Sequence, residues 1–93
     1  MPLRPIGHID LPPERLDKLR AALDEHVRLA RAEPGCLSFQ VTPDPKLPGR
    51  FNVAEPFASR EDFEAHQARA ATRDWGRLTR GIPRSYRIEE VAG

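Results

Sequence analysis

Residues 51–66 read FNVAEPFASREDFEAH, a pattern that predicts a β-strand running directly into a capped helix. Alternate residues of its first half would share one face of the strand: Phe51, Val53, Glu55 and Phe57. Ser59 is a favourable N-cap residue, and Asp62 stands at the capping-box position that follows it. Phe63 then begins the buried side of the helix, and His66 lies at the edge of that side. The segment therefore carries a carboxylate and an imidazole toward one apolar face.

Glu55 and His66 are the candidate catalytic residues. Glu55 would lie among apolar strand neighbours, where a carboxylate needs a partner. It either forms a structural salt bridge or orients His66 and a substrate. His66 is either a packed histidine that donates to a backbone carbonyl or a general base, a role that suits its ordinary pKa near ~6.5.

The rest of the chain continues the alternation of strands and helices. Strands are expected over residues 3–11, 36–42, 50–57 and 84–91, and helices over residues 14–32 and 59–73, with a short helical turn over 77–81. Three apolar residues of the first strand share one of its sides: Leu3, Ile9 and Leu11. Those expected to point inward from the second strand are Leu37, Phe39 and Val41. The first helix carries an apolar stripe of Leu16, Leu19, Leu23, Val27 and Ala30. His26 is expected at the flank of this stripe as a partly exposed residue.

The order β-α-β-β-α-β predicts a ferredoxin-like α+β fold. Right-handed crossovers and short connections give a four-stranded antiparallel sheet with both helices on one face. Residues 1–93 form a single domain, of a size that buries only about 60–65 % of its unfolded surface. The sheet face without helices needs a cover, so we expect a homodimer whose sheets face each other.

The composition argues against several classes of function. Fifteen basic and fourteen acidic residues are scattered along the chain, without the basic stripe of a nucleic-acid-binding protein. No apolar run is long enough to cross a membrane, and the N-terminus lacks the apolar segment of a signal peptide. A single cysteine, Cys36, and three scattered histidines make a disulfide or a metal site unexpected. A cytoplasmic location fits these features.

Three segments, in this order, resemble the antibiotic biosynthesis monooxygenase (ABM) family. They are EPGCL at residues 33–37, DPKLPGRF at residues 44–51, and the pattern F-x3-E-x-F-x-S-x-E-x-F-x2-H that ends at His66. The resemblance implies a dimeric α+β barrel. It also implies an oxygenase that needs no cofactor and acts on quinols or polycyclic phenols, although the family includes haem-degrading relatives and members without known activity.

The chain departs from the family pattern at three places. Phe57 stands where the family often has tryptophan, and no second histidine follows His66. Pro56 lacks the backbone N–H expected of a strand residue. A mechanism that needs two histidines is therefore in doubt here.

Five further residues are candidates for substrate binding: Asn52, Trp75, His8, Phe39 and Tyr86. Trp75 either packs under the last strand or lines a pocket for an aromatic ring. Asn52 is either a strand surface residue or a polar group that reaches a bound carbonyl. His8 is either a pocket residue or a surface or dimer contact, while Phe39 and Tyr86 belong to the core or an interface, or stack on the substrate.

The leading hypothesis is a monooxygenase without a cofactor that acts on a small aromatic phenol or quinol. His66, oriented by Glu55, would accept the phenolic proton, while Asn52 and Trp75 position the ring. The alternative is a non-catalytic dimeric module that binds a small hydrophobic metabolite or has a structural role. A cavity of roughly 300 Å³ or more beside His66 would favour a ligand site.

Overall fold

The computed structural model describes residues 2–90 of the chain. Its elements are β1 (Leu3–Asp10), the 3₁₀ turn η1 (Pro13–Arg15), α1 (Leu16–Arg31), β2 (Gln40–Pro43), β3 (Arg50–Ala54), α2 (Arg60–Thr72), α3 (Asp74–Leu78) and β4 (Arg84–Glu90). The predicted order of strands and main helices is confirmed, with α3 beginning three residues before the expected turn. None of the helices described is long and apolar enough to cross a membrane.

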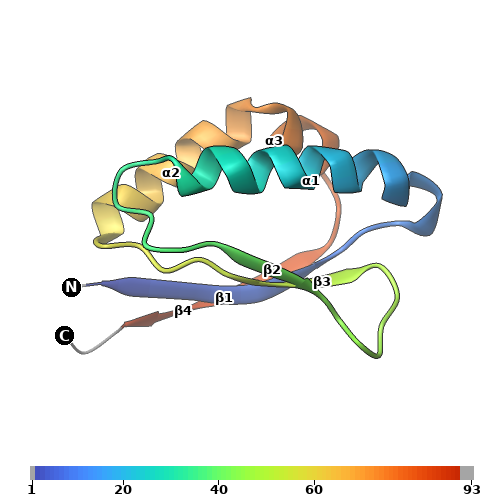
Figure 1. The fold of residues 1–93 in the computed structure, drawn as a ribbon, viewed down its shortest axis with the longest axis horizontal. Coiled ribbons are helices and arrows are strands. Elements are labelled where there is room, and N and C mark those ends of the chain that lie inside the picture. Colours follow the sequence, from blue (N-terminus) through green and yellow to red (C-terminus); the bar gives the residue numbers. More distant parts are fainter. Residues whose placement is uncertain (1, 91–93) are drawn as a thin grey trace.

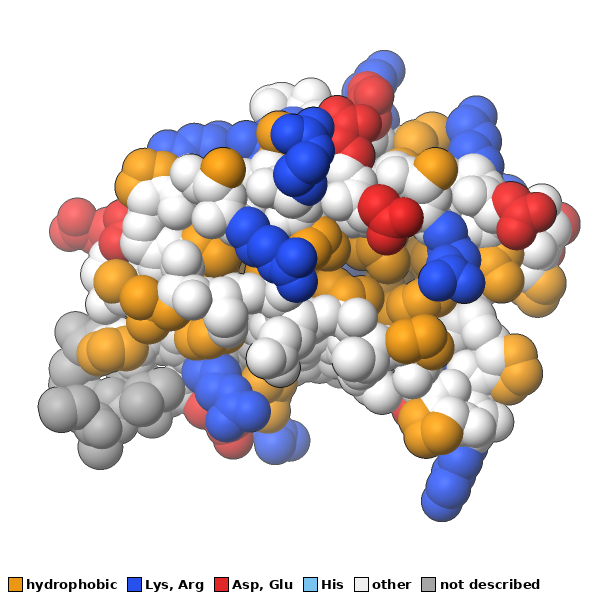
Figure 2. Space-filling view, in the orientation of Figure 1, with side chains coloured by type: hydrophobic (Ala, Val, Ile, Leu, Met, Phe, Trp, Pro, Cys, Tyr) orange, Lys and Arg blue, Asp and Glu red, His pale blue; other side chains and the backbone are white. Residues whose placement is uncertain are grey.

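The four strands form one antiparallel sheet in the order β2-β3-β1-β4. All three α-helices lie on the same face of this sheet (Figure 1). Within residues 2–90 no helix covers the other face, which we call the outer face. Basic and acidic side chains are interspersed over the surface seen in Figure 2. The predicted ferredoxin-like α+β architecture is confirmed.

Alternation along β1 decides which of its side chains enter the core. Leu3, Ile9 and the following Leu11 are buried. Between them, Gly7 lies opposite Tyr86 of β4. A Cβ at this position would stand only 2.5 Å from the Tyr86 Cα, so β4 can lie this close to β1 only beside a glycine.

The main core lies between α1 and the sheet. Leu19 and Leu23 of α1 pack with buried residues of β1, β3, α3 and the segment after β1: Ile9, Leu11, Phe51 and Trp75. Burial of such side chains contributes about 1.5–3 kcal/mol each to folding. Val27 and Leu16, which the periodicity also placed on the stripe, lie at its partly buried margin.

A second, smaller core cluster fixes the start of α2. It contains Leu3, Phe57 and Phe63. The Ser59 hydroxyl accepts a hydrogen bond from the backbone N–H of Asp62 at 3.2 Å, which is the predicted N-cap. This cap and cluster set the position of the whole helix, including His66.

The predicted strand over residues 36–42 is wrong at its beginning, because β2 starts only at Gln40. The carbonyl of Phe39 accepts hydrogen bonds from the Arg31 guanidinium at 2.7 and 3.2 Å instead of joining the ladder. Leu37, predicted to point inward, is 59% exposed. Phe39 itself is buried, as predicted.

The third strand also ends earlier than predicted, at Ala54. Pro56 has no N–H to donate, and Phe57 rejoins the sheet only through isolated bridges to Leu3 and Cys36. Glu55 still donates its backbone N–H to Pro5 at 3.0 Å. Residue 91, the expected end of the last strand, lies outside the described residues.

Candidate active site

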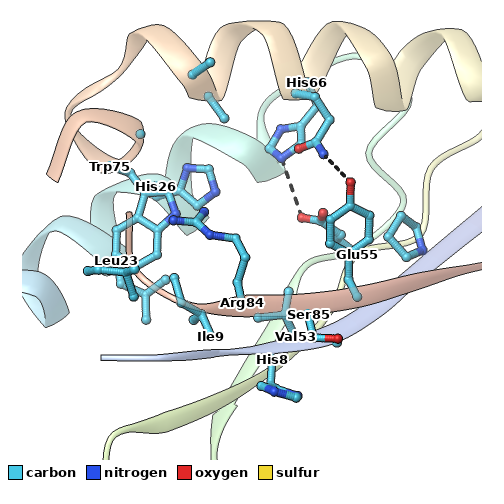
Figure 3. Close-up of a pocket in the computed structure, with 18 of the residues that line it drawn as sticks. His8, Ile9, Leu23, His26, Val53, Glu55, His66, Trp75, Arg84 and Ser85 are labelled. Atoms are coloured by element: carbon cyan, nitrogen blue, oxygen red, sulfur yellow. Dashed lines mark hydrogen bonds and ion pairs between the residues drawn. The ribbon is translucent and has the colours of Figure 1, made fainter. Parts of the chain in front are cut away.

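A cavity of about 490 Å³ lies between the sheet and the helices. Strands β1, β3 and β4 form one side, and α1, α2 and α3 form the other (Figure 3). Three small residues of the helices leave room in it: Ala70, Ala71 and Gly76. His66 and Glu55, the two candidate catalytic residues, both line it.

His66 is buried and held by carboxylates on both ring nitrogens. Its side chain is 2% exposed. Nδ1 lies 2.6 Å from Glu33 Oε2, and Nε2 lies 3.5 Å from Glu55 Oε2. Figure 3 shows the Glu55 carboxylate reaching from the sheet toward the His66 ring on α2. The sequence thus correctly predicted that Glu55 and His66 meet.

Glu33 is the site residue that sequence reasoning missed. It follows the C-terminal end of α1, where its N–H donates to the Ala30 carbonyl at 3.1 Å. Gly35 then turns the chain with a positive φ of 79°, and a Cβ there would collide with Asp62. Just beyond the end of α1, the Glu33 carboxylate reaches His66 of α2.

Glu33 is in turn held by arginines of α2 and the residue after it. Its Oε1 lies 3.0 Å from Arg73 Nη1 and 3.9 Å from Arg69 Nη1. The Arg73 contact is an ion pair whose angles fall outside hydrogen-bond geometry. A buried carboxylate needs such compensation, since an isolated one would take up a proton instead.

The environment of His66 favours its protonated form. Burial alone would lower the pKa of His66, but the hydrogen bonds and negative charges of Glu55 and Glu33 outweigh it and raise the pKa above its ordinary value. In the neutral ring, the short contact to Glu33 assigns the proton to Nδ1. Nε2 then presents a lone pair beside Glu55 and the cavity. This arrangement can accept a proton from a bound hydroxyl group.

His26 corrects a prediction, because it is 5% exposed rather than partly exposed. It follows Leu23 by three residues and so lies on the same inner side of α1. Its ring stacks on Trp75, with 5.5 Å between the ring centroids. Burial, together with repulsion from His66, Arg73 and Arg84, lowers the pKa of His26 to about 4. Its ring is therefore neutral at physiological pH.

Trp75 and Phe39 lie beside the candidate histidines. Both aromatic residues are buried and both line the cavity. The Phe39 ring meets His26 edge-on at 5.5 Å and lies 6.1 Å from His66. The two alternatives that the sequence left open for Trp75, core packing and pocket lining, are thus both present in the structure.

Tyr86 lies at the border of the cavity. Its residue is 54% exposed, and its hydroxyl accepts a hydrogen bond from Gln67 of α2 at 3.4 Å. The contact joins β4 to α2, and both residues line the cavity. Such a weak, exposed bridge can open and close with little loss of stability.

Asn52 and His8 are not brought to His66. They face each other in the β1–β3 register, and Asn52 donates to Asp44 at 3.2 Å. His8 borders the cavity through its strand, but Figure 3 shows its side chain on the outer face. Strand alternation turns Asn52 to the face opposite Val53. The expectation that Asn52 positions a ring beside His66 is therefore wrong.

Among residues 2–90, no three histidine, cysteine or acidic residues form a group that could hold a metal ion. Glu33 and Glu55 instead contact opposite nitrogens of the same imidazole.

Comparisons with known proteins show the family of the chain. The family model for antibiotic biosynthesis monooxygenase matches residues 2–78. The chain belongs to the ABM family. A comparison with curated proteins gave no match.

Solved structures of similar fold include several bacterial proteins. A candidate antibiotic biosynthesis monooxygenase from Nitrosomonas europaea has a TM-score of 0.84 and 21% identity to this chain. The alignment covers 95% of this chain and 88% of the Nitrosomonas chain. A protein from Pseudomonas aeruginosa has a TM-score of 0.80 and 25% identity, with 99% and 95% covered. A protein from Mycobacterium tuberculosis has a TM-score of 0.80 and 21% identity, with 100% and 97% covered.

One feature of this ABM chain bears on the missing second histidine. The sequence has no histidine after His66, but the fold brings His26 of α1 to within 5.6 Å of it, measured between ring centroids. The signal that could have revealed it is the spacing of Leu19, Leu23, His26 and Ala30, all four of which are buried. In this chain the second imidazole of the cavity comes from the first helix.

Proposed function

We propose that this ABM protein is a monooxygenase that needs no cofactor and acts on a small aromatic phenol or quinol. The observation that carries the proposal is the His66 imidazole at the wall of a cavity of about 490 Å³, fixed by Glu33 on one nitrogen with the other beside Glu55. A volume of this size lies within the ordinary range of about 300–1,000 Å³ for ligand sites. The same constellation supports proton transfer better than metal chemistry.

In the proposed reaction His66 removes a proton from the substrate. The hydroxyl of a bound phenol donates to Nε2, and the imidazolium that forms is stabilised by the two carboxylates. The phenolate is a better electron donor and reacts directly with dioxygen. For an anthrone, one oxygen atom becomes the new carbonyl oxygen, the other leaves as water, and the substrate supplies all the electrons.

The walls of the cavity would supply alignment and exclude water. Trp75 and Phe39 offer flat apolar surfaces against which an aromatic ring can lie. A dry, preformed site favours charge transfer because solvent does not have to reorganise around it.

A homodimer formed through the outer faces of two sheets belongs to this proposal. A domain of this size gains stability from a second subunit, and isologous pairing covers the face that carries His8 and Asn52. These two polar residues would then be interface groups rather than substrate contacts.

The alternative function is binding without turnover. It is favoured by the ion-pair chain from Arg73 through Glu33 to His66, because this chain gives each group a structural role even without chemistry. In that case the cavity would hold a hydrophobic metabolite, and no oxygen would be consumed.

The test combines a ligand screen with oxygen uptake. Quinols, anthrones, flavonoids and haem are screened by thermal shift, and oxygen consumption is then measured with each ligand that binds. His66→Gln should reduce consumption at least a hundredfold, while His8→Gln, the same change on the outer face, should leave it within twofold. Equal turnover in the His66→Gln protein would reject the mechanism, and tight binding without any oxygen uptake would establish the alternative.

A further inference from the structure

We propose that the cavity has a second, cationic end formed by Arg84, and that the ligand is a hydroxylated aromatic acid whose anionic group lies against this arginine. The inference rests on the proposed site at His66 and adds the substrate class. It is carried by the distribution of charged side chains around the cavity.

Charges of opposite sign lie at different places on the cavity wall. Glu55 is the acidic residue that lines it, and its carboxylate is directed at His66. Arg80 and Arg84, from the segment after α3 and from β4, also line it. Among the described residues, neither arginine has a carboxylate within ion-pair distance, in contrast to Arg73, which pairs with Glu33.

The guanidinium of Arg84 makes one hydrogen bond, so most of its donors have no partner among residues 2–90. Its Nη2 donates to the Thr79 carbonyl at 2.6 Å, and the Thr79 hydroxyl donates to the Trp75 carbonyl at 2.6 Å. Arginine has five N–H donors in a planar fork, which suits two-point binding of a carboxylate. The residue as a whole is exposed, and the partial burial of its guanidinium lowers the pKa of Arg84.

The neighbouring His26 indicates the same electrostatic environment. Figure 3 shows the Arg84 side chain extending from β4 toward His26 and Trp75. His26 is more than nine-tenths buried, and its Nδ1 has no hydrogen-bond partner within residues 2–90. Its low pKa arises from burial and from repulsion by His66, Arg73 and Arg84. These neighbouring cations make this part of the cavity favourable for an anion, whose presence would raise the pKa of His26.

The two ends therefore prescribe one orientation for the ligand. A hydroxyl group fits the Glu55–His66 end, where a carboxylate would be repelled by Glu33 and Glu55. A carboxylate fits the Arg84 end, and the ring between them lies along Trp75 and Phe39. A neutral quinol would leave the Arg84 charge without a partner and should bind more weakly.

Calorimetric titration with three naphthalene probes tests the inference on the intact protein. 6-Hydroxy-2-naphthoate should bind at least tenfold more tightly than its methyl ester and than 2-naphthol. Arg84→Gln should reduce this ratio to below threefold, mainly by weakening the acid. Arg87→Gln, on the same strand but at its exposed outer side, should leave the ratio unchanged.

Equal affinity for the acid and the ester, or no binding of the acid at millimolar concentration, would overturn the inference. A ratio that survives in the Arg84→Gln protein would overturn it as well. If that variant does not fold, the comparison of acid and ester on the unmodified chain still decides. Because binding is measured without turnover, a retained preference for the acid together with absent oxygen uptake would reject the oxygenase proposal alone.

Discussion

At the scale of single residues, the site is an imidazole whose two nitrogens have different tasks. Glu33 binds Nδ1 at 2.6 Å and fixes the ring, whereas Nε2 lies 3.5 Å from Glu55. The juxtaposition of Glu55 and His66 followed from strand alternation and helical spacing, so the sequence could predict it. The role of Glu33 could not be predicted, because its contact with His66 joins the end of α1 to α2 through the tertiary fold.

Replacing Glu33 with glutamine should shift the pH dependence of activity. The variant keeps the shape of the side chain but removes a charge that raises the pKa of His66. The activity needs neutral His66, so it rises as the pH increases through this pKa. In Glu33→Gln the midpoint of the rise should lie lower by about one pH unit or more. The measurement is kcat/KM for oxygen uptake between pH 5 and pH 9. An unmoved midpoint would mean that His66 is not the titrating base.

His26 should make the protein less stable in acid. Its pKa is lowered from 6.5 to about 4 in the folded protein, so the unfolded chain binds the proton more readily. The resulting stability is fully present above pH 6.5 and is lost as the pH falls toward 4, by about 3 kcal/mol in total. His26→Phe should remove this part of the pH dependence. The free energy of unfolding is measured in urea for both proteins from pH 7 to pH 4. An equal loss of stability in the two proteins over this range would contradict the assignment.

At the scale of elements, the sequence predicted which segments are helices and strands better than where they end. The early end of β3 is explained by Pro56, and the late start of β2 by the Arg31 side chain, which binds the Phe39 carbonyl. The first cause is visible in the sequence, since proline cannot donate to a ladder. The second depends on a tertiary contact that no local pattern encodes.

The N-cap of α2 should make a measurable contribution to stability. Ser59→Ala removes the acceptor for the Asp62 N–H and should lower the free energy of unfolding by about 1 kcal/mol. Ser59→Thr, which restores a hydroxyl that can accept from the Asp62 N–H and donate to the Asp62 carboxylate, should recover most of the loss. The check is chemical denaturation of the three proteins at pH 7, and identical midpoints for serine and alanine would show that the cap is dispensable.

At the scale of the whole molecule, the order of elements was sufficient to predict the sheet and the side on which the helices lie. The cavity could not be predicted, because it depends on how far the small residues of α2 and α3 stand from the sheet. Its two polar ends combine residues from α1, α2, β3 and β4, which are distant in the chain. Only the folded arrangement brings them to one space.

The outer face of the sheet is the proposed dimer interface, which can be tested in solution. We expect a homodimer in solution, and Asn52→Arg should weaken it by placing like charges opposite each other across the two-fold axis. Light scattering coupled to size-exclusion chromatography should give twice the mass of the 10.5 kDa chain for the unmodified protein. A stable dimer has a dissociation constant far below about 100 μM. A protein that is monomeric at all concentrations up to this value would contradict the proposed interface.

The central claim is that His66 is a base with an available Nε2, aligned by two carboxylates. Nuclear magnetic resonance of ¹⁵N-labelled histidine, followed from pH 5 to pH 9, measures both its pKa and its tautomer. The account predicts that His66 titrates above 6.5 and that its neutral form carries the proton on Nδ1. A pKa at or below 6.5, or a neutral ring protonated on Nε2, would contradict it.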